Sequence, residues 1–362
     1  MMTSSLLYRS DIEAVRQRLN TWWGGGDIGR PVALITGPRE VPLEDVPALP
    51  EPDNWVTHYS IRDFAYRVNC AARACLHTQY WGEAVPCSAP DLGPNCLALY
   101  LGCQGVEMPG TVWFEPCIED PLKARFACEE DNFYWDFTLR LAREHVRLGK
   151  GKFLTSFPDL IEGLDTLAAM RGTKALLIDL LERPAWVHRS LERITELYFH
   201  YYDALYDLIR DETGGSHFWS WAPGRMAKFQ CDFSTMISPS MFIEFMVPVL
   251  DEMSQRVDHC MYHWDGPGAI PHHEALLSVS GIDAIQWTPG SGVEPLAHAR
   301  WWPLYHRTVE AGKKVVLLGV GGLAEFAALK REFGPELKQF LLSAHVRSAA
   351  EAEEVLEQLR FN

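Results

Sequence analysis

The sequence predicts an α/β protein, namely a (β/α)8 TIM barrel that follows an irregular, aromatic-rich N-terminal extension. Its 362 residues leave room for such a barrel, which commonly needs about 250 residues. Beyond residue 136, short apolar runs alternate with amphipathic stretches, and this alternation implies parallel strands joined by crossover helices. No Gly-x-Gly-x-x-Gly run follows an early strand, so nothing favours a dinucleotide-binding fold instead.

The first part of the chain differs in composition from the rest. Residues 50–135 are rich in Trp, Tyr, Phe, Cys, Pro and Gly and show little helical period. We therefore expect residues 1–135 to form helices and loops that act as a lid or a subunit contact. Residues 136–362 carry the regular strand–helix units, and the whole of 1–362 is expected to be one domain.

The regular part begins with a short strand at 152–156. A helical stretch at 164–181 follows, interrupted near Gly172, and Pro184 then opens a long helix that runs to about Arg210, because proline suits the first turn of a helix. Further strands are expected at 216–221, 260–264, 283–287, 313–319 and 340–343, and further helices after the capping residue Ser238, at 323–332 and at 349–359.

Charge and cysteine usage limit the classes of partner. The chain has 33 Lys and Arg residues against 48 Asp and Glu residues, a formal charge of −15, which argues against nucleic acid and anionic membrane surfaces. The nine cysteines form no Cys-x-x-Cys pair, so reduced thiols fit better than a disulfide framework. With no signal-like start and no long apolar run, we expect a cytoplasmic protein.

Polar residues stand where the predicted strand 260–264 ends. His263 and Asp265 are two positions apart and therefore point to the same side of the strand. Together they can bind a metal ion or share a proton. The glycines at 266 and 268 form a turn that lets a ligand approach the backbone. The alternative is an ion pair that only fixes the end of the strand.

Tryptophans near other strand ends predict a small-molecule pocket. Trp219 and Trp221 are also two positions apart, and we expect them to line one side of the predicted strand 216–221. Gln286 offers an amide and Trp287 a flat apolar wall at the end of the predicted strand 283–287. Ordinary packing in the core is the alternative for the tryptophans.

Two carboxylates in loops are candidates for the same site. Asp159 follows the strand at 152–156 and is placed to enter the site, whereas Asp165 is expected to cap the next helix. Asp232 follows Cys231 in a loop and is a candidate acid or base.

Several of these motifs together resemble the uroporphyrinogen decarboxylase superfamily, most closely its uroporphyrinogen-III decarboxylase-like branch. The resemblance extends over about residues 140–360 and implies a (β/α)8 barrel. It also implies one of two chemistries, cofactor-free decarboxylation of a porphyrinogen, or methyl transfer with thiols and corrinoid proteins at a zinc ion held by a His-x-Cys pair and a later Cys. The matching stretches are 230–234, 237–239, 262–268, 283–287 and 343–348.

The chain departs from both chemistries. The paired arginines that bind porphyrinogen propionates are missing, and a charge of −15 would repel such a substrate. Asp265 stands where the zinc enzymes have Cys, and no Cys follows Cys260. A site with nitrogen and oxygen ligands in place of thiolates, made of His263, Asp265 and His345, could still hold zinc, which accepts such ligands. Without a metal, His263 and Asp265 would act as an acid–base pair.

We therefore expect an enzyme that acts on a small organic molecule, first by methyl transfer linked to a corrinoid protein. His263, Asp265 and Asp232 would carry the chemistry. Decarboxylation of a small acid without a cofactor is the second interpretation, and a non-catalytic binding barrel is the third. The resemblance also suggests a homodimer. The residues expected to hold the substrate are Asp159, Trp219, Trp221, Gln286 and Trp287.

Overall fold

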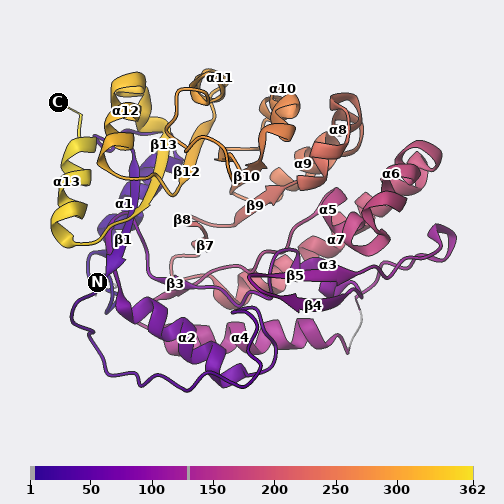
Figure 1. Cartoon of the computed structure of the whole chain (residues 1–362), viewed down its shortest axis with the longest axis horizontal. Helices are drawn as coiled ribbons and strands as arrows, with labels where there is room; N and C mark the ends of the chain where they lie inside the picture. Colours follow the sequence, from indigo (N-terminus) through magenta and orange to yellow (C-terminus); the bar gives the residue numbers. More distant parts are fainter. Residues whose placement is uncertain (1–4, 129–130, 362) are drawn as a thin grey trace.

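A mostly parallel, seven-stranded sheet forms the centre of the molecule (Figure 1). The computed structural model describes residues 5–128 and 131–361. Within these residues the strand order is β2-β1-β13-β12-β11-β10-β9, and every neighbouring pair is parallel except the antiparallel pair of β1 and β2. The strands are β1 (Val32–Pro38), β2 (Thr78–Gly82), β9 (Met226–Gln230), β10 (His259–Asp265), β11 (Ala284–Thr288), β12 (Lys314–Leu318) and β13 (Phe340–His345).

Helices that connect the parallel strands cover the outer face of this sheet (Figure 1). The capping expectations hold: the side chain of Ser238 accepts a hydrogen bond from the backbone N–H of Met241, and Pro184 opens a helix that ends at Ile209. The α-helices of this part are α7 (Pro184–Ile209), α8 (Pro239–Phe245), α9 (Val247–Ser254), α10 (His273–Ser278), α11 (Trp302–Glu310), α12 (Leu323–Phe333) and α13 (Ala349–Leu359), and the 3-10 helices are η2 (Asp232–Met236), η3 (Pro267–His272) and η4 (Gly334–Gln339).

Three small sheets complete the described part of the chain. The sheets are the parallel pair β3 (Cys87–Ser88) and β6 (Leu154–Thr155), the antiparallel pair β4 (Gln104–Met108) and β5 (Thr111–Glu115), and the antiparallel pair β7 (Ser216–Phe218) and β8 (Ser220–Ala222). A hydrogen bond from Ser156 N to Ser88 O (2.8 Å) extends the pairing of β6 with β3, and one from Phe157 N to His217 O (3.0 Å) links this sheet to β7. Strand pairing therefore shows an α/β fold with a mostly parallel sheet, and it does not by itself close a ring.

The prediction of one strand over residues 216–221 is wrong. The chain reverses at Trp219, whose φ of +58° lies in the left-handed region, so that β7 and β8 pair with each other. Because the strand turns back, Trp219 lies at the tip of a hairpin. The strands predicted at 260–264, 283–287, 313–319 and 340–343 are confirmed with small shifts at their ends.

The N-terminal part is more regular than its composition suggested. It supplies β1 to the seven-stranded sheet, where this strand pairs with β13 from the C-terminal end of the chain. No helix in the described part of the chain is long and apolar enough to cross a membrane. The remaining helices are α1 (Ile12–Trp23), α2 (Phe64–His77), α3 (Cys96–Tyr100), α4 (Phe133–Gly149), α5 (Gly163–Arg171), α6 (Thr173–Glu182) and the 3-10 helix η1 (Pro121–Lys123).

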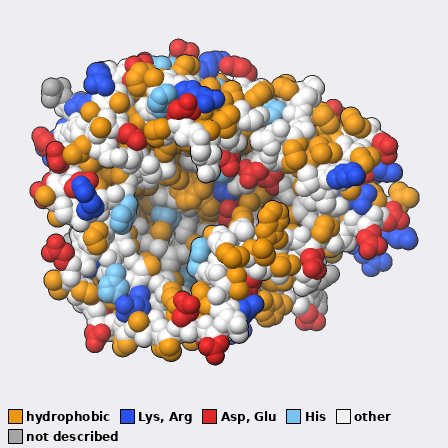
Figure 2. All heavy atoms as spheres, in the orientation of Figure 1, with side chains coloured by type: hydrophobic (Ala, Val, Ile, Leu, Met, Phe, Trp, Pro, Cys, Tyr) orange, Lys and Arg blue, Asp and Glu red, His pale blue; other side chains and the backbone are white. Residues whose placement is uncertain are grey.

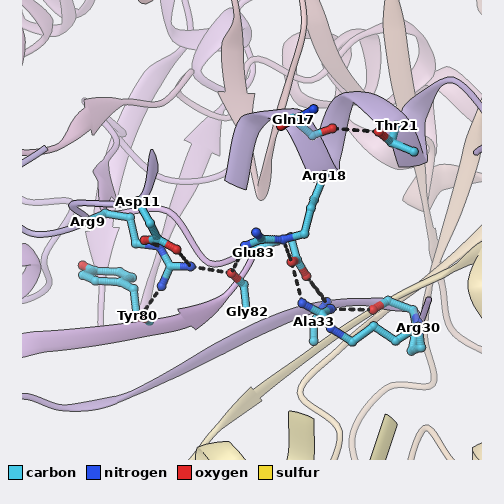
Figure 3. A network of polar contacts seen from close by, with 11 residues as sticks. Arg9, Asp11, Gln17, Arg18, Thr21, Arg30, Ala33, Tyr80, Gly82 and Glu83 are labelled. Atoms are coloured by element: carbon cyan, nitrogen blue, oxygen red, sulfur yellow. Dashed lines mark hydrogen bonds and ion pairs between the residues drawn. The ribbon is translucent and has the colours of Figure 1, made fainter. Parts of the chain in front are cut away.

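A buried carboxylate fixes the N-terminal strands to helix α1 (Figure 3). Glu83 is fully buried after β2, and Arg30 binds both of its oxygens at 2.7 Å. Arg18 of α1 donates a further bond at 2.6 Å, and the backbone N–H of Ala33 in β1 another at 3.0 Å. Burial alone would raise the pKa of Glu83, but these bonds and charges lower it below its ordinary value, so the carboxylate stays ionised.

Candidate functional site

Three side chains with metal-binding or acid–base chemistry meet at the carboxyl ends of β9 and β10. Asp232, His263 and Asp265 each place one ligand atom within 4.8 Å of the others. His263 and Asp265 reach the same place because they are two positions apart on β10. Asp232 reaches it because β9 is the parallel neighbour of β10, so both strands end at the same edge of the sheet.

Gln286 orients the imidazole of His263. The two residues face each other across the β10–β11 register, and Nδ1 of His263 bonds to Oε1 of Gln286. The amide nitrogen of Gln286 donates to Thr288 Oγ1 and to the carbonyl oxygen of Trp287, both at 2.9 Å, and this fixes the amide oxygen toward the ring. His263 therefore carries its proton on Nδ1 and keeps the lone pair of Nε2 for the site.

Asp232 is held by a second carboxylate. Asp165 lies in the first turn of α5, and its carboxylate accepts hydrogen bonds from the backbone N–H groups of Asp232 (2.9 Å) and Phe233 (2.8 Å). The helix-capping position that was predicted for Asp165 belongs to Glu162. The amide nitrogen of Gln230 also bonds to Asp232 Oδ2 at 3.1 Å, so the loop after β9 has a defined position.

A buried lysine lies beneath these carboxylates. Lys228 points inward from β9, is 4% exposed, and forms an ion pair with Asp159 at 2.5 Å. Its ammonium group also donates to Oε1 of Gln230. Asp159 does reach the site region, as predicted, but its charge there is paired with a lysine that the sequence analysis did not select.

Burial and charge shift two pKa values in the cluster. Although Asp232 lies at an exposed edge, burial of its carboxyl group and the charges of Asp165 and Asp265 raise its pKa to about 7. Burial lowers the pKa of His263, and the positive charge of Lys228 lowers it further. At neutral pH the imidazole is therefore neutral, which is the form that binds metals or accepts a proton.

A cavity of about 370 Å³ is connected to the cluster through Trp219, although none of the three cluster residues lines it. Trp219 lines it, and the ring of Trp219 meets the ring of His263 edge to face at 5.5 Å. Figure 2 shows a hollow with histidine side chains on its walls and acidic side chains gathered to one side. A second cavity of about 490 Å³ adjoins Asp232 on the side of Asp165 and Gln230.

Three further candidates lie outside the cluster, and two of them line the 370 Å³ cavity. Trp287 is 1% exposed and packs between Trp264 and Trp301, so it is part of the core. The prediction that it lines the pocket is wrong, because neighbouring strand residues face opposite sides and Gln286 already faces inward. Trp221 does line the 370 Å³ cavity, though its indole N–H bonds to Asp211. His345 lines that cavity too, and the structure does not bring it into the cluster.

The sequence analysis missed Lys228, Gln230 and the role of Asp165. A signal for the first two was present, because a lysine and a glutamine alternate with apolar residues at 226–230, immediately before Asp232. A strand with inward-facing polar side chains at a pocket edge has this pattern. No local signal shows the bond of Asp165 to the loop, since the two segments are 67 positions apart.

Comparisons with known proteins support the fold but do not show a family. No family model matches the chain, and no curated protein matches it. A methyltransferase from Methanosarcina mazei has a similar structure, with a TM-score of 0.58 over 95% of this chain and 96% of that chain, at 12% sequence identity. Such a low identity shows a shared fold alone. Membership of the uroporphyrinogen decarboxylase superfamily therefore stays a prediction.

The donor set of the cluster fits a metal ion. One imidazole nitrogen and two carboxylate oxygens suit Zn²⁺ with nitrogen and oxygen ligands, and a site with three protein ligands has a position free for substrate. It does not fit thiolate coordination, because no cysteine belongs to this cluster of described residues and burial raises the pKa of the neighbouring Cys231 thiol well above its usual value.

Proposed function

We propose that the chain is an enzyme that transfers a methyl group to or from a small organic molecule. The observation that carries this proposal is the convergence of Asp232, His263 and Asp265 next to Trp219, which lines a ligand-sized cavity. The fold shared with a methyltransferase supports the reaction class. The motifs that resemble the uroporphyrinogen decarboxylase superfamily also support it, because corrinoid-dependent methyl transfer is one of the two chemistries of that superfamily. On the same grounds, the methyl group would be carried by a separate corrinoid protein.

The three residues of the cluster would hold a divalent metal ion, with zinc as the first choice. When bound, such an ion would lower the pKa of a thiol or hydroxyl group of the substrate and so make that heteroatom a better methyl acceptor or leaving group.

The surrounding residues position the reaction. Gln286 keeps the Nε2 lone pair of His263 directed into the site. Next to the site, the positive charge of Lys228 is neutralised by Asp159. The indole of Trp219 forms an apolar wall next to His263, which excludes water and orients the substrate.

The proposal includes a closed (β/α)8 barrel. The bonds that join Ser156 to β3 and Phe157 to β7 support this proposal, because these short strands would then form the remaining wall of the curved sheet. In such a barrel, active sites lie at the carboxyl ends of the strands, which is where His263 and Asp265 stand.

The test is methyl transfer from methylcobalamin to a panel of small thiols, amines and alcohols, followed by the change in cobalamin absorbance. We expect turnover that falls at least about 100-fold in His263→Ala and Asp265→Asn. His259→Ala is the matched control, because His259 lies on the same strand, next to a carboxylate (Asp283, 3.5 Å), but at the opposite end. Equal loss in the control, or no transfer to any acceptor, would contradict the proposal.

One observation favours a second candidate, decarboxylation of a small acid. Because the pKa of Asp232 is raised to about 7, part of this group is protonated at neutral pH and could protonate a carbanion. Release of CO2 that is lost in Asp232→Asn, with no transfer from methylcobalamin, would favour this reaction. Ligand binding without turnover in either assay would favour a binding protein.

A further inference from the structure

A thiol and an imidazole lie on the wall of the 370 Å³ cavity, apart from the metal-binding cluster, and a buried hydroxyl group lies behind the imidazole. Cys87 Sγ lies 3.5 Å from Nε2 of His217, and Nδ1 of His217 lies 3.2 Å from Oγ of Ser156. Cys87 and His217 both line the cavity, and Cys87 is partly accessible while His217 is buried. The three residues come from β3, from the segment after β6 and from β7, so three separate parts of the fold build this arrangement.

The hydrogen bonds fix which nitrogen of His217 carries the proton. The hydroxyl of Ser156 donates to the backbone carbonyl oxygen of His217 at 2.8 Å. Toward Nδ1 this hydroxyl can therefore only accept, which places the ring proton on Nδ1. Nε2 is then an acceptor that faces the thiol of Cys87. A thiol, a base directed at it and a third group that orients the base form the arrangement of an activated cysteine nucleophile.

The pair rests in its neutral form. Burial lowers the pKa of His217 to about 4 and raises the pKa of the Cys87 thiol. A standing thiolate is therefore excluded at neutral pH, and the proton has to move to His217 as the sulfur attacks, as it does when a histidine acts as general base for a neutral nucleophile.

The cavity favours a neutral, largely apolar molecule. Its walls include Leu34, Val85, Trp219 and Leu318, and none of its described lining residues is Lys or Arg. Its one carboxylate, Glu83, is already bound by two arginines. An anionic substrate would find no free cation there, and a volume of about 370 Å³ is that of a small-molecule site.

We propose that Cys87 is a nucleophile that accepts an alkyl group from a small neutral molecule in this cavity, with His217 as its general base. The sulfur–carbon bond forms as the bond from that carbon to its leaving heteroatom breaks, and the leaving group takes the bonding electrons. The thiol proton moves to Nε2 of His217 and then to the leaving group, so that the products are an S-alkyl cysteine and the protonated leaving group. This proposal does not depend on the metal-binding cluster or on methyl transfer there.

The test is alkylation with iodoacetamide at pH 7, with the rate at each cysteine measured by peptide mass spectrometry. Cys75 is the matched control, because it is buried beside the same strand, has no histidine partner given by the structure, and has a pKa raised to about 12 by burial. We expect Cys87 to react at least about 10-fold faster than Cys75 and to prefer neutral iodoacetamide over anionic iodoacetate more strongly than the exposed Cys70 does.

Two variants separate base catalysis from simple access. His217→Gln should slow Cys87 at least about 10-fold, and Ser156→Ala, which keeps the base but frees its tautomer, should slow it less. The rates at Cys70 and Cys75 should stay unchanged in both, which also shows that the variants are folded. If Cys87 reacts no faster than Cys75 in the unaltered protein, or if neither variant slows it, the proposal is wrong.

Discussion

Two charged clusters of this protein have opposite designs. Around Glu83 both carboxylate oxygens are engaged by two arginines and a backbone N–H, and the carboxylate is fully buried. Around His263 the ring is held on one side by Gln286, while two carboxylates lie close to it, and one of them, Asp232, lines a cavity. Both clusters carry charge, so charge does not distinguish them. The difference is that both carboxylate oxygens of Glu83 are engaged in bonds that stabilise the fold, whereas the cluster around His263 has polar atoms available to a ligand.

The largest effect is expected at the cluster around Glu83. Glu83→Ala leaves Arg18 and Arg30 without their buried partner, which costs about 3–5 kcal/mol in the free energy of unfolding measured with urea. The exposed pair of Glu274 and Arg307 is the control, and Glu274→Ala should move the urea midpoint little. If the urea midpoint shifted equally in both variants, the buried Glu83 cluster would stabilise the fold no more than an exposed ion pair, and the prediction would be wrong.

A smaller effect on stability, but a large one on the site, is expected at Gln286. Gln286→Leu keeps the size of the side chain and removes the acceptor that fixes Nδ1 of His263. Zinc affinity should fall about 10- to 100-fold, as is usual for loss of a group that orients a metal ligand. Gln286→Glu retains an acceptor oxygen and should keep most of the affinity in a calorimetric titration. An unchanged affinity in the leucine variant would mean that Gln286 does not orient the ring.

The pH dependence of stability sharpens the comparison, because the carboxyl group of Asp91, next to Asp159, lacks the two arginine side chains that bind Glu83. Burial, and then the charge of Asp159, raise the pKa of Asp91 to about 7. Since this folded-state pKa lies above that of the unfolded chain, the group stabilises the fold at low pH and loses that contribution as the pH rises to about 7. Unfolding free energies of the unaltered protein and Asp91→Asn should therefore diverge between about pH 4 and 7 and run parallel above it. A constant difference would show that Asp91 titrates normally.

The smallest effect on stability is expected at the hairpin tip. Trp219→Gly relieves a left-handed backbone that costs an ordinary residue about 1 kcal/mol, and it loses the contact of the indole with His263. The two changes oppose each other, so the thermal midpoint should move little while methyl transfer falls. If the thermal midpoint dropped by more than about 8 °C, Trp219 would mainly stabilise the fold and would not be specific to the site.

Much of the second half of the fold could be predicted from local signals. β12 has adjacent valines and leucines ended by Gly319, and α8 follows a serine cap and a proline, so the pattern alone defines their positions. The hairpin at Trp219 could not be predicted, because tryptophan rarely adopts a positive φ and no glycine or asparagine marks the turn. Strand β1 was not predicted for a different reason, because its partner β13 lies about 300 positions away in the sequence.

The site was predictable only where strand periodicity decides orientation. The spacing of His263 and Asp265 correctly placed both on one face, and the same rule should have separated Gln286 from Trp287. Lys228 and Asp165 act through contacts between distant segments, and single-sequence reasoning has no access to these.

Metal analysis of protein purified without chelator tests most directly whether Asp232, His263 and Asp265 form a metal centre. We predict about one zinc ion per chain, lost in Asp265→Ala and in His263→Ala and retained in the control His259→Ala. Protein that transfers methyl groups without any bound metal, or zinc that remains in the two cluster variants, would contradict the account.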